Sequence, residues 1–190
     1  MFRNKQLLRV SQITGLLGIA IGLTGCVHLP KPAAPAQIAA LQFALISLHP
    51  QIQTNEAAQV ATLAYEYPHQ LAGEYRLVRP PLFHNLLINL RLKQRGLCYQ
   101  WAEDLAARLQ TLDLESLELH WGVAREGTLR EHNTVVITAW NQPFTNGIVL
   151  DPWRRSGALV WTAVTNDTYA WVEGVLSVAP TPTPGAPATP

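Results

Sequence analysis

The apolar residues of the chain follow two different spacings, and the change falls just before residue 117. Before it, apolar positions recur every three or four residues, as on one face of an α-helix. The helical half predicts four helices, at residues 37–48, from Thr54 or Asn55 to about 67, at 82–95, and from Cys98 to about 112. Residues 71–78 have no clear period.

Prolines and one glycine set the expected ends of these helices. Pro50 follows the first helix, and Pro68 is expected to end the second because proline has no backbone N–H to donate. Pro80 and Pro81 precede the third helix. Gly96 separates the third helix from the one that begins at Cys98.

In the second half apolar and polar residues alternate, as in strands with one buried face. The pattern predicts strands at 117–123, 133–140, 147–150 and 158–162, and residues 169–178 fit either a fifth strand or a short helix. Because the helices precede the strands instead of alternating with them, we expect an α+β domain whose N-terminal helices pack on an antiparallel sheet.

The first 25 residues have the composition of an export signal. Three basic residues precede an apolar run from 13 to 23, which is too short to span a bilayer comfortably. The run ends at Leu23-Thr24-Gly25-Cys26, which resembles the lipobox of bacterial lipoproteins. The resemblance implies that Cys26 is acylated and holds the chain on a membrane.

The expected organisation is therefore a signal peptide at 1–25, a proline-containing tether at 26–36, one domain at 37–178 and a disordered Pro/Thr-rich tail at 179–190. The predicted location is the cell envelope. In a Gram-negative cell, Val27 after the lipidated cysteine favours the periplasmic face of the outer membrane.

Composition excludes some partners. The chain has 190 residues, 14 basic and 13 acidic, with a net charge of +1 and no basic stripe, so a nucleic-acid partner is not expected. No cofactor or metal is predicted from the residue spacings, and His49, His69 and His84 are expected to be surface or capping residues. The basic residues near the end of the third helix, Arg91, Lys93 and Arg95, indicate a solvated face, or alternatively one that meets lipid phosphates.

Cys98 is the candidate nucleophile. A cysteine in the first turn of a helix meets unpaired N–H groups and the positive end of the helix dipole, both of which stabilise a thiolate. If Cys26 carries lipid, Cys98 has no partner for a disulfide inside the chain. The alternative is a buried structural thiol, since Cys98 shares a helical face with Trp101 and Leu105.

A thiolate needs a base, and the base needs an acceptor that orients it. His132 opens one expected strand and Asp151 closes the next. A hairpin turn centred between Asn141 and Gln142 would put the two directly opposite each other. A turn at Asn146-Gly147 would instead separate them along the ladder, and a long irregular loop could contain both turn signals.

In this order the residues resemble the transglutaminase-like superfamily, a branch of the papain-like thiol enzymes. The resemblance rests on Gly-x-Cys-x-x-Trp-Ala at 96–102 with His132 and Asp151, and covers about 96–153. It implies that Cys98, His132 and Asp151 form a catalytic triad and that Trp101 packs beneath it.

Two positions depart from the family pattern. Thr134 stands where many members have an aromatic residue, and Leu92 stands where papain-like enzymes have a glutamine. The oxyanion donor is therefore open between the backbone of Cys98 and the side chains of Gln94 and Gln100.

The expected activity is hydrolysis of a peptide or amide bond, or amine transfer, in a peptide or protein substrate. Two alternatives remain: a non-catalytic envelope lipoprotein that uses the fold for binding or assembly, and a Cys/His/Asp metal site that includes His120.

Overall fold

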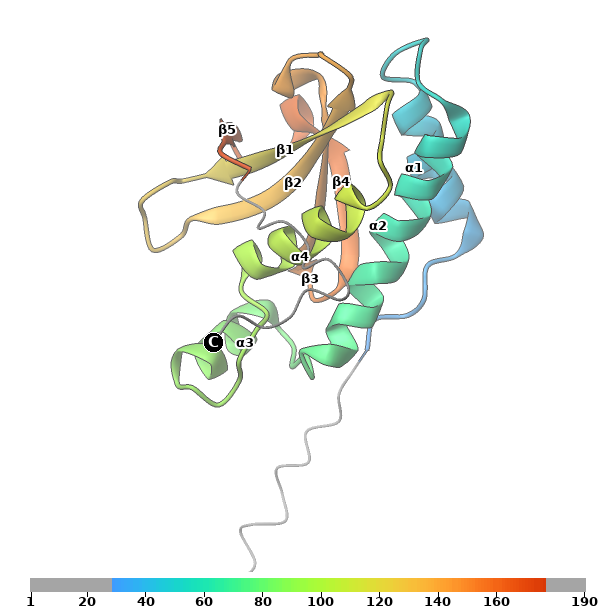
Figure 1. Ribbon diagram of the computed structural model, residues 1–190. Coiled ribbons are helices and arrows are strands. Elements are labelled where there is room, and N and C mark those ends of the chain that lie inside the picture. Colours follow the sequence, from blue (N-terminus) through green and yellow to red (C-terminus); the bar gives the residue numbers. More distant parts are fainter. Residues whose placement is uncertain (1–28, 177–190) are drawn as a thin grey trace, which may run out of the picture.

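The computed structural model describes residues 29–176, and the expected signal peptide, Cys26 and the tail lie outside this range. The domain is α+β, with three of the four helices in the described range on one side of an antiparallel sheet and the third helix of the chain beyond its end (Figure 1). Its helices are α1 (Pro35–Ile46), α2 (Thr54–Glu74), α3 (Pro81–Asn89) and α4 (Cys98–Gln110). Its strands are β1 (Leu117–Ala124), β2 (His132–Ala139), β3 (Ile148–Arg155), β4 (Ala158–Ala163) and β5 (Val172–Gly174).

The sheet has the order β4-β3-β2-β1-β5, and its two faces have different covers. Odd-numbered residues of β2, such as Val135 and Ile137, pack in the main core with Leu105 and Leu109 of α4 and with apolar residues of α1 and α2. Even-numbered residues of β2 point to the opposite face, because side chains alternate along a strand. There Val136 packs with residues from short loop segments, among them Trp171. The four-helix and sheet prediction is thus confirmed.

The pairing of β2 with β3 differs from the expected hairpin by two residues. The numbers of opposed residues add to 285, as for Val135 opposite Leu150, whereas a direct His132–Asp151 pair would require 283. Because side chains alternate with a period of two, a shift of two leaves both residues on one face. His132 and Asp151 are consequently diagonal neighbours, which polar side chains can still bridge.

The connection between these strands explains the shift. It contains both turn signals, with a positive φ of 56° at Asn141 and a short 3₁₀ helix at Phe144–Asn146. Gly147 then enters β3 with extended backbone, so the Asn-Gly pair does not form a tight two-residue hairpin.

Two helix ends were predicted wrongly. α2 continues through Pro68 to Glu74, because Pro68, Leu71 and Ala72 are buried and their packing outweighs the lost backbone hydrogen bond. α3 ends at Asn89 and not at residue 95.

The early end of α3 is a Schellman motif. Arg91 has a positive φ of 59°, its N–H donates to Ile88 and that of Leu92 donates to Leu87. A glycine is the usual residue at such a position, so a helix end at arginine leaves no sequence signal.

Within residues 29–176, no helix has both the length and the apolar character needed to cross a bilayer.

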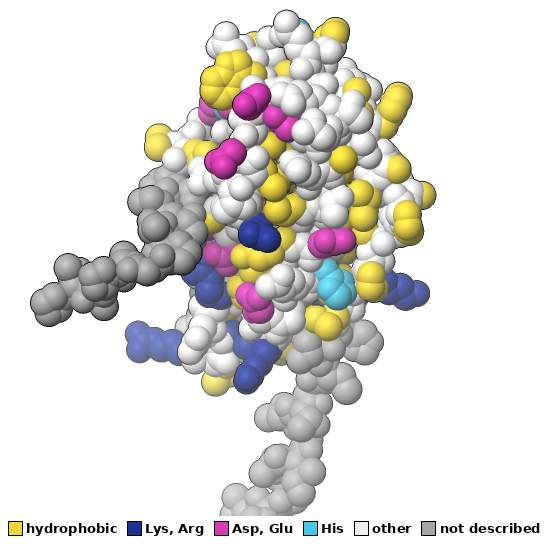
Figure 2. Space-filling model, turned by 45° about the vertical axis from the view of Figure 1, so that its right-hand side comes forward, with side chains coloured by type: hydrophobic (Ala, Val, Ile, Leu, Met, Phe, Trp, Pro, Cys, Tyr) yellow, Lys and Arg dark blue, Asp and Glu magenta, His cyan; other side chains and the backbone are white. Residues whose placement is uncertain are grey.

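The expected tether partly belongs to the domain. α1 begins at Pro35 and not at residue 37, and Pro30 is buried beside the turn between β3 and β4. Figure 2 shows that the Lys and Arg side chains on the visible face lie in the lower half of the molecule, and most of them lie toward the lower end, where α3 is found in Figure 1.

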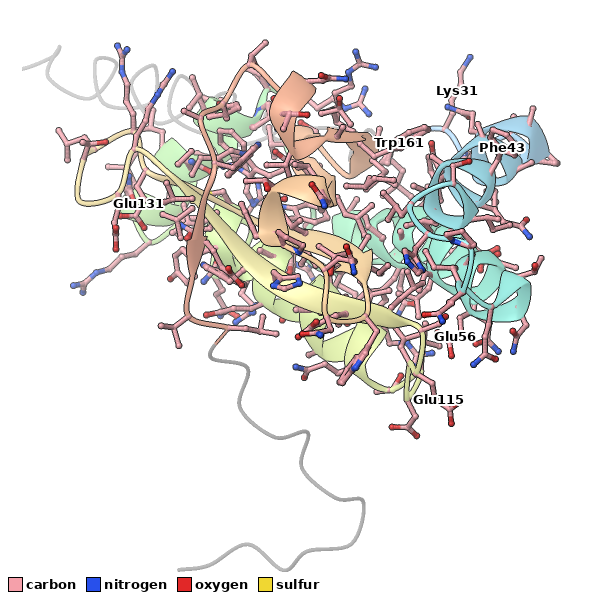
Figure 3. All side chains as sticks on the ribbon, turned by 90° about the horizontal axis from the view of Figure 1, so that it is seen from above. Lys31, Phe43, Glu56, Glu115, Glu131 and Trp161 are labelled. Atoms are coloured by element: carbon pink, nitrogen blue, oxygen red, sulfur yellow. The ribbon has the colours of Figure 1, made fainter. Side chains whose placement is uncertain are left out.

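A buried carboxylate joins the helical layer to the sheet. Glu56, in the first turn of α2, accepts the backbone N–H groups of Glu115 and Ser116, each at 2.9 Å (Figure 3). Burial would raise the pKa of Glu56, but these hydrogen bonds bring it below its usual value. The contact fixes the start of β1 against α2.

Candidate active site

A cleft of about 540 Å³ opens where α4 and β2 both begin. Cys98 is the first residue of α4 and His132 the first of β2, and both line the cleft. The two elements meet although α4 covers one face of the sheet and the His132 side chain lies on the other, because both residues stand at the end of the sheet. In Figure 3, Glu131 marks this end, far from Phe43 on α1.

Three side chains fix the backbone turn before Cys98. Gln100 Oε1 accepts the N–H of Gly96 at 2.8 Å, and the buried Trp101 donates its Nε1–H to the Gly96 carbonyl at 3.0 Å. Gly96 has φ of 128°, and a Cβ built on it would lie 2.4 Å from Nε2 of His84. Only glycine fits there, and the contacts fix the start of α4.

The expectation that His84 is a surface or capping residue was wrong. His84 is fully buried, although it belongs to the mostly exposed α3. Its Nδ1 accepts the Val78 N–H at 3.2 Å, so its Nε2 donates to the Arg95 carbonyl at 2.9 Å. Burial lowers the pKa of His84, and the neutral ring joins the two segments that flank α3.

A buried carboxylate orients His132 beside the Cys98 thiol. Its Nε2 lies 2.6 Å from Oδ2 of Asp151, and both side chains are almost fully buried. Its Nδ1 is also buried and makes no hydrogen bond within the described part of the chain. The Cys98 thiol adjoins the ring closely enough to affect its pKa, while Sγ lies 3.8 Å from the carbonyl oxygen of Glu131.

These surroundings favour the protonated imidazole. Burial alone would lower the pKa of His132, but the hydrogen bond to Asp151 and the adjacent Cys98 raise it to about 9. Three aromatic rings also surround the imidazole, with centroids 4.8 Å away for Trp153, 4.9 Å for Tyr169 and 5.4 Å for Trp171. Aromatic faces attract a cation.

Asp151 is held by an arginine that the sequence did not reveal. Arg154 donates Nε–H to Oδ2 of Asp151 at 2.6 Å, and its other guanidinium nitrogens bind Asp167 in a bidentate pair. Burial would raise the pKa of Asp167, but Arg154 and the indole N–H of Trp171 bring it down to about 2. Each buried charge thus has a partner.

The structure separates the expected supporting residues. Gln100 is occupied in the turn before α4, and Trp101 packs behind the same turn. Gln94 is exposed and lines a different hollow with Tyr75 and Lys93. The cleft instead contains Asn85 of α3, whose Oδ1 accepts the indole N–H of Trp153 at 3.3 Å.

His120 lies apart from the cleft. It sits on β1, where Nδ1 contacts Glu173 at 2.6 Å and Nε2 contacts Thr138 at 2.9 Å. Among residues 29–176, no group of three or more His, Cys, Asp or Glu side chains is arranged to hold a metal ion. His49 and His69 are partly exposed.

The site therefore combines a thiol at a helix N-terminus, a buried imidazole with one nitrogen free of hydrogen bonds in the part of the chain that the structure describes, and a buried carboxylate on the other nitrogen. Such a set can transfer a proton between the sulfur and a bound group while the ring stays in place. No protein-family model, curated protein or solved structure matches this chain.

Proposed function

We propose that the protein is a membrane-anchored thiol enzyme that acts on peptide or amide bonds through Cys98, His132 and Asp151. The observation that carries the proposal is the state of the two His132 nitrogens: Nε2 is held by a buried carboxylate, while Nδ1 is buried beside a thiol and has no hydrogen-bond partner among residues 29–176. A structural histidine would be expected to satisfy both nitrogens.

This arrangement decides which group carries the proton at each step of the proposed reaction. With its pKa near 9, the His132 ring keeps a proton at neutral pH and can pair with the Cys98 thiolate. The thiolate attacks the substrate carbonyl carbon, and the imidazolium gives its Nδ1 proton to the departing amine. Water or a second amine then releases the thioester, with His132 taking the proton of the incoming group.

Two donors are suited to the oxyanion that forms during attack. The backbone N–H of Cys98 is among the first in α4, which have no partner within the helix. Indole N–H groups only donate, so the Asn85 atom facing Trp153 must be its oxygen. The Asn85 amide nitrogen is thereby left to donate within the cleft, in place of Gln94 or Gln100.

The fold class and the chain order of the three residues support membership of the transglutaminase-like group. The lipobox at Leu23–Cys26 supports anchoring in the cell envelope. A peptide or protein substrate suits the cleft, whose lining includes apolar Leu82 and Leu129 and basic Arg125 and Arg130. Hydrolysis is the first choice of reaction and amine transfer the second.

The test is alkylation of Cys98 by iodoacetamide at pH 6, followed by peptide mass spectrometry so that Cys26 does not contribute. Most free thiols are protonated at this pH and react slowly. We expect fast labelling that falls about 10²-fold in His132→Ala. His120→Ala is the matched control, because His120 also binds a carboxylate on the same face of the sheet, and it should leave the rate unchanged.

If Cys98 is labelled no faster than a cysteine in a short peptide, the proposal that the protein is a thiol enzyme is contradicted. That result would favour a non-catalytic lipoprotein that uses the domain for binding or assembly. Equal losses in His132→Ala and His120→Ala would show a general effect on the fold and would also count against the triad.

A further inference from the structure

α3 exposes three apolar side chains, those of Leu82, Phe83 and Leu86. His84 is the one buried residue of the helix. Leu82 is 71% exposed, Leu86 49% and, just after the helix, Leu90 58%. A nine-residue helix that turns its leucines outward gains little from packing, so its exposed face requires another explanation.

The charges around α3 have one sign. Residues 76–95 contain five basic residues and no acidic one. Arg95 pairs with Asp104 and Glu103, whereas Arg76, Arg79, Arg91 and Lys93 have no carboxylate within ion-pair distance in the described part of the chain. Exposed leucines combined with uncompensated cations are typical of a segment that lies on an anionic lipid surface.

The position of the anchor agrees with this surface. Leu29 lies beside the last turn of α2, where a Cβ built on Gly73 would be 3.8 Å from its Cδ2. Three residue steps separate Leu29 from Cys26, a span of at most about 11 Å. The C-terminal end of α2 leads directly into the loop before α3, and this end of α2 and α3 lie at the lower end in Figure 1, where most of the basic side chains visible in Figure 2 are found.

We propose that residues 76–95, with α3 at their centre, lie on the anionic phospholipid surface of the membrane that holds the Cys26 anchor. Leu82 and Asn85 of α3 also line the cleft, so this contact sets the mouth of the cleft at the bilayer surface. The enzyme then acts on peptide segments close to the membrane. The inference rests on the Cys26 anchor of the proposed function and not on the triad.

A fluorescent probe on the full-length chain tests this. In a Cys98→Ser background, Leu86→Cys carries the environment-sensitive label NBD, and the protein is reconstituted in vesicles of phosphatidylethanolamine and phosphatidylglycerol. Phe43→Cys is the matched control, because Phe43 is 72% exposed on α1, which Figure 3 shows across the molecule from Glu131 and the cleft. Spin-labelled lipid should quench the probe at position 86 several-fold more than the probe at 43.

A charge-reversed chain with Arg79→Glu, Arg91→Glu and Lys93→Glu should lose most of the difference, as should vesicles of neutral phosphatidylcholine. Equal quenching at both positions would overturn the inference. So would a blue shift at position 86 that grows with protein concentration without lipid, which would indicate a second copy on this face.

The same preparation separates this inference from the proposed function. The mass of the purified chain reports acylation, and an unacylated Cys26 would overturn the anchor and the orientation together. Slow alkylation of Cys98 in the unsubstituted chain would overturn the enzyme, while the quenching result at position 86 would still hold.

Discussion

Two histidines on one face of the sheet each contact a carboxylate at 2.6 Å, yet their surroundings differ. At His132 and Asp151 the side chains are 3% and 1% exposed, and one ring nitrogen has no hydrogen bond within the described residues. At His120 the ring is 10% exposed, Glu173 is 52% exposed, and the second nitrogen contacts Thr138. The distance to the carboxylate alone does not distinguish the two histidines.

The difference teaches what separates a base from a structural histidine. At His120 both nitrogens are occupied, so the ring has no free position for a reacting group. At His132 the carboxylate orients the ring, while the second nitrogen stays next to the thiol and the cleft. Substitutions at each pair should therefore have unequal effects on stability and on the reactivity of Cys98.

Removing the two carboxylates should have very different consequences. Asp151→Ala leaves His132 and Arg154 without their buried partner and should lower the free energy of unfolding by about 3–5 kcal/mol. Glu173→Ala removes an exposed partner and should cost less than about 1 kcal/mol. Urea denaturation measures both, and similar losses would remove the distinction between the two pairs.

Asn85 should matter for acyl transfer alone. Acylation of Cys98 by p-nitrophenyl acetate passes through an oxyanion, so Asn85→Ala should slow it by about 10²-fold. Alkylation by iodoacetamide forms no oxyanion and should keep its rate. Gln94→Ala is the control and should change neither reaction, because Gln94 lines another hollow. Equal slowing of both reactions by Asn85→Ala would assign Asn85 a structural role.

The raised pKa of His132 should make stability depend on pH. The pKa is near 9 in the folded chain and about 6.5 when unfolded, so the stabilisation is complete below pH 6.5. It should be lost as pH rises through 9, by on the order of 1–3 kcal/mol. His132→Gln should flatten the decline, measured by thermal unfolding at several pH values. His120→Gln should retain it, and a decline unchanged in His132→Gln would assign it to other groups.

Arg154→Lys should have the smallest effect. Lysine keeps the charge but cannot bind Asp151 and Asp167 together as the guanidinium does, so we expect a loss of about 1 kcal/mol in stability. The alkylation rate at pH 6 should fall only slightly, because Asp151 still binds His132. A loss as large as that of Asp151→Ala would show that the arginine, and not the pair with His132, holds the site together.

The helices and strands followed from the spacing of apolar residues because each element buries one face, and the expected start at Cys98 agrees with the structure. The predicted ends of α2 at Pro68 and of α3 near residue 95 were wrong. At the first, packing of Leu71 and Ala72 outweighs the effect of proline, and at the second, the positive φ of Arg91 has no sequence signal.

The three candidate residues were predicted from their types and their places at the ends of helices and strands. The residues that hold them in position were not predicted. Arg154 follows Asp151 by three residues, so this contact is local, but Arg154 also binds Asp167 on another segment. Asn85 meets Trp153, and His84 fits Gly96, only once α3 folds back. Apolar spacing predicts none of these contacts.

Local spacing of apolar residues was enough to predict which segments are helix and strand, because it decides which side chains one face can bury. The shared face of His132 and Asp151, the burial of His84 and the separation of His120 from the cleft could not be predicted in this way, because a register shift of one residue would have put His132 and Asp151 on opposite faces. These depend on contacts between distant segments, whose free energies are set by the packing of the whole domain.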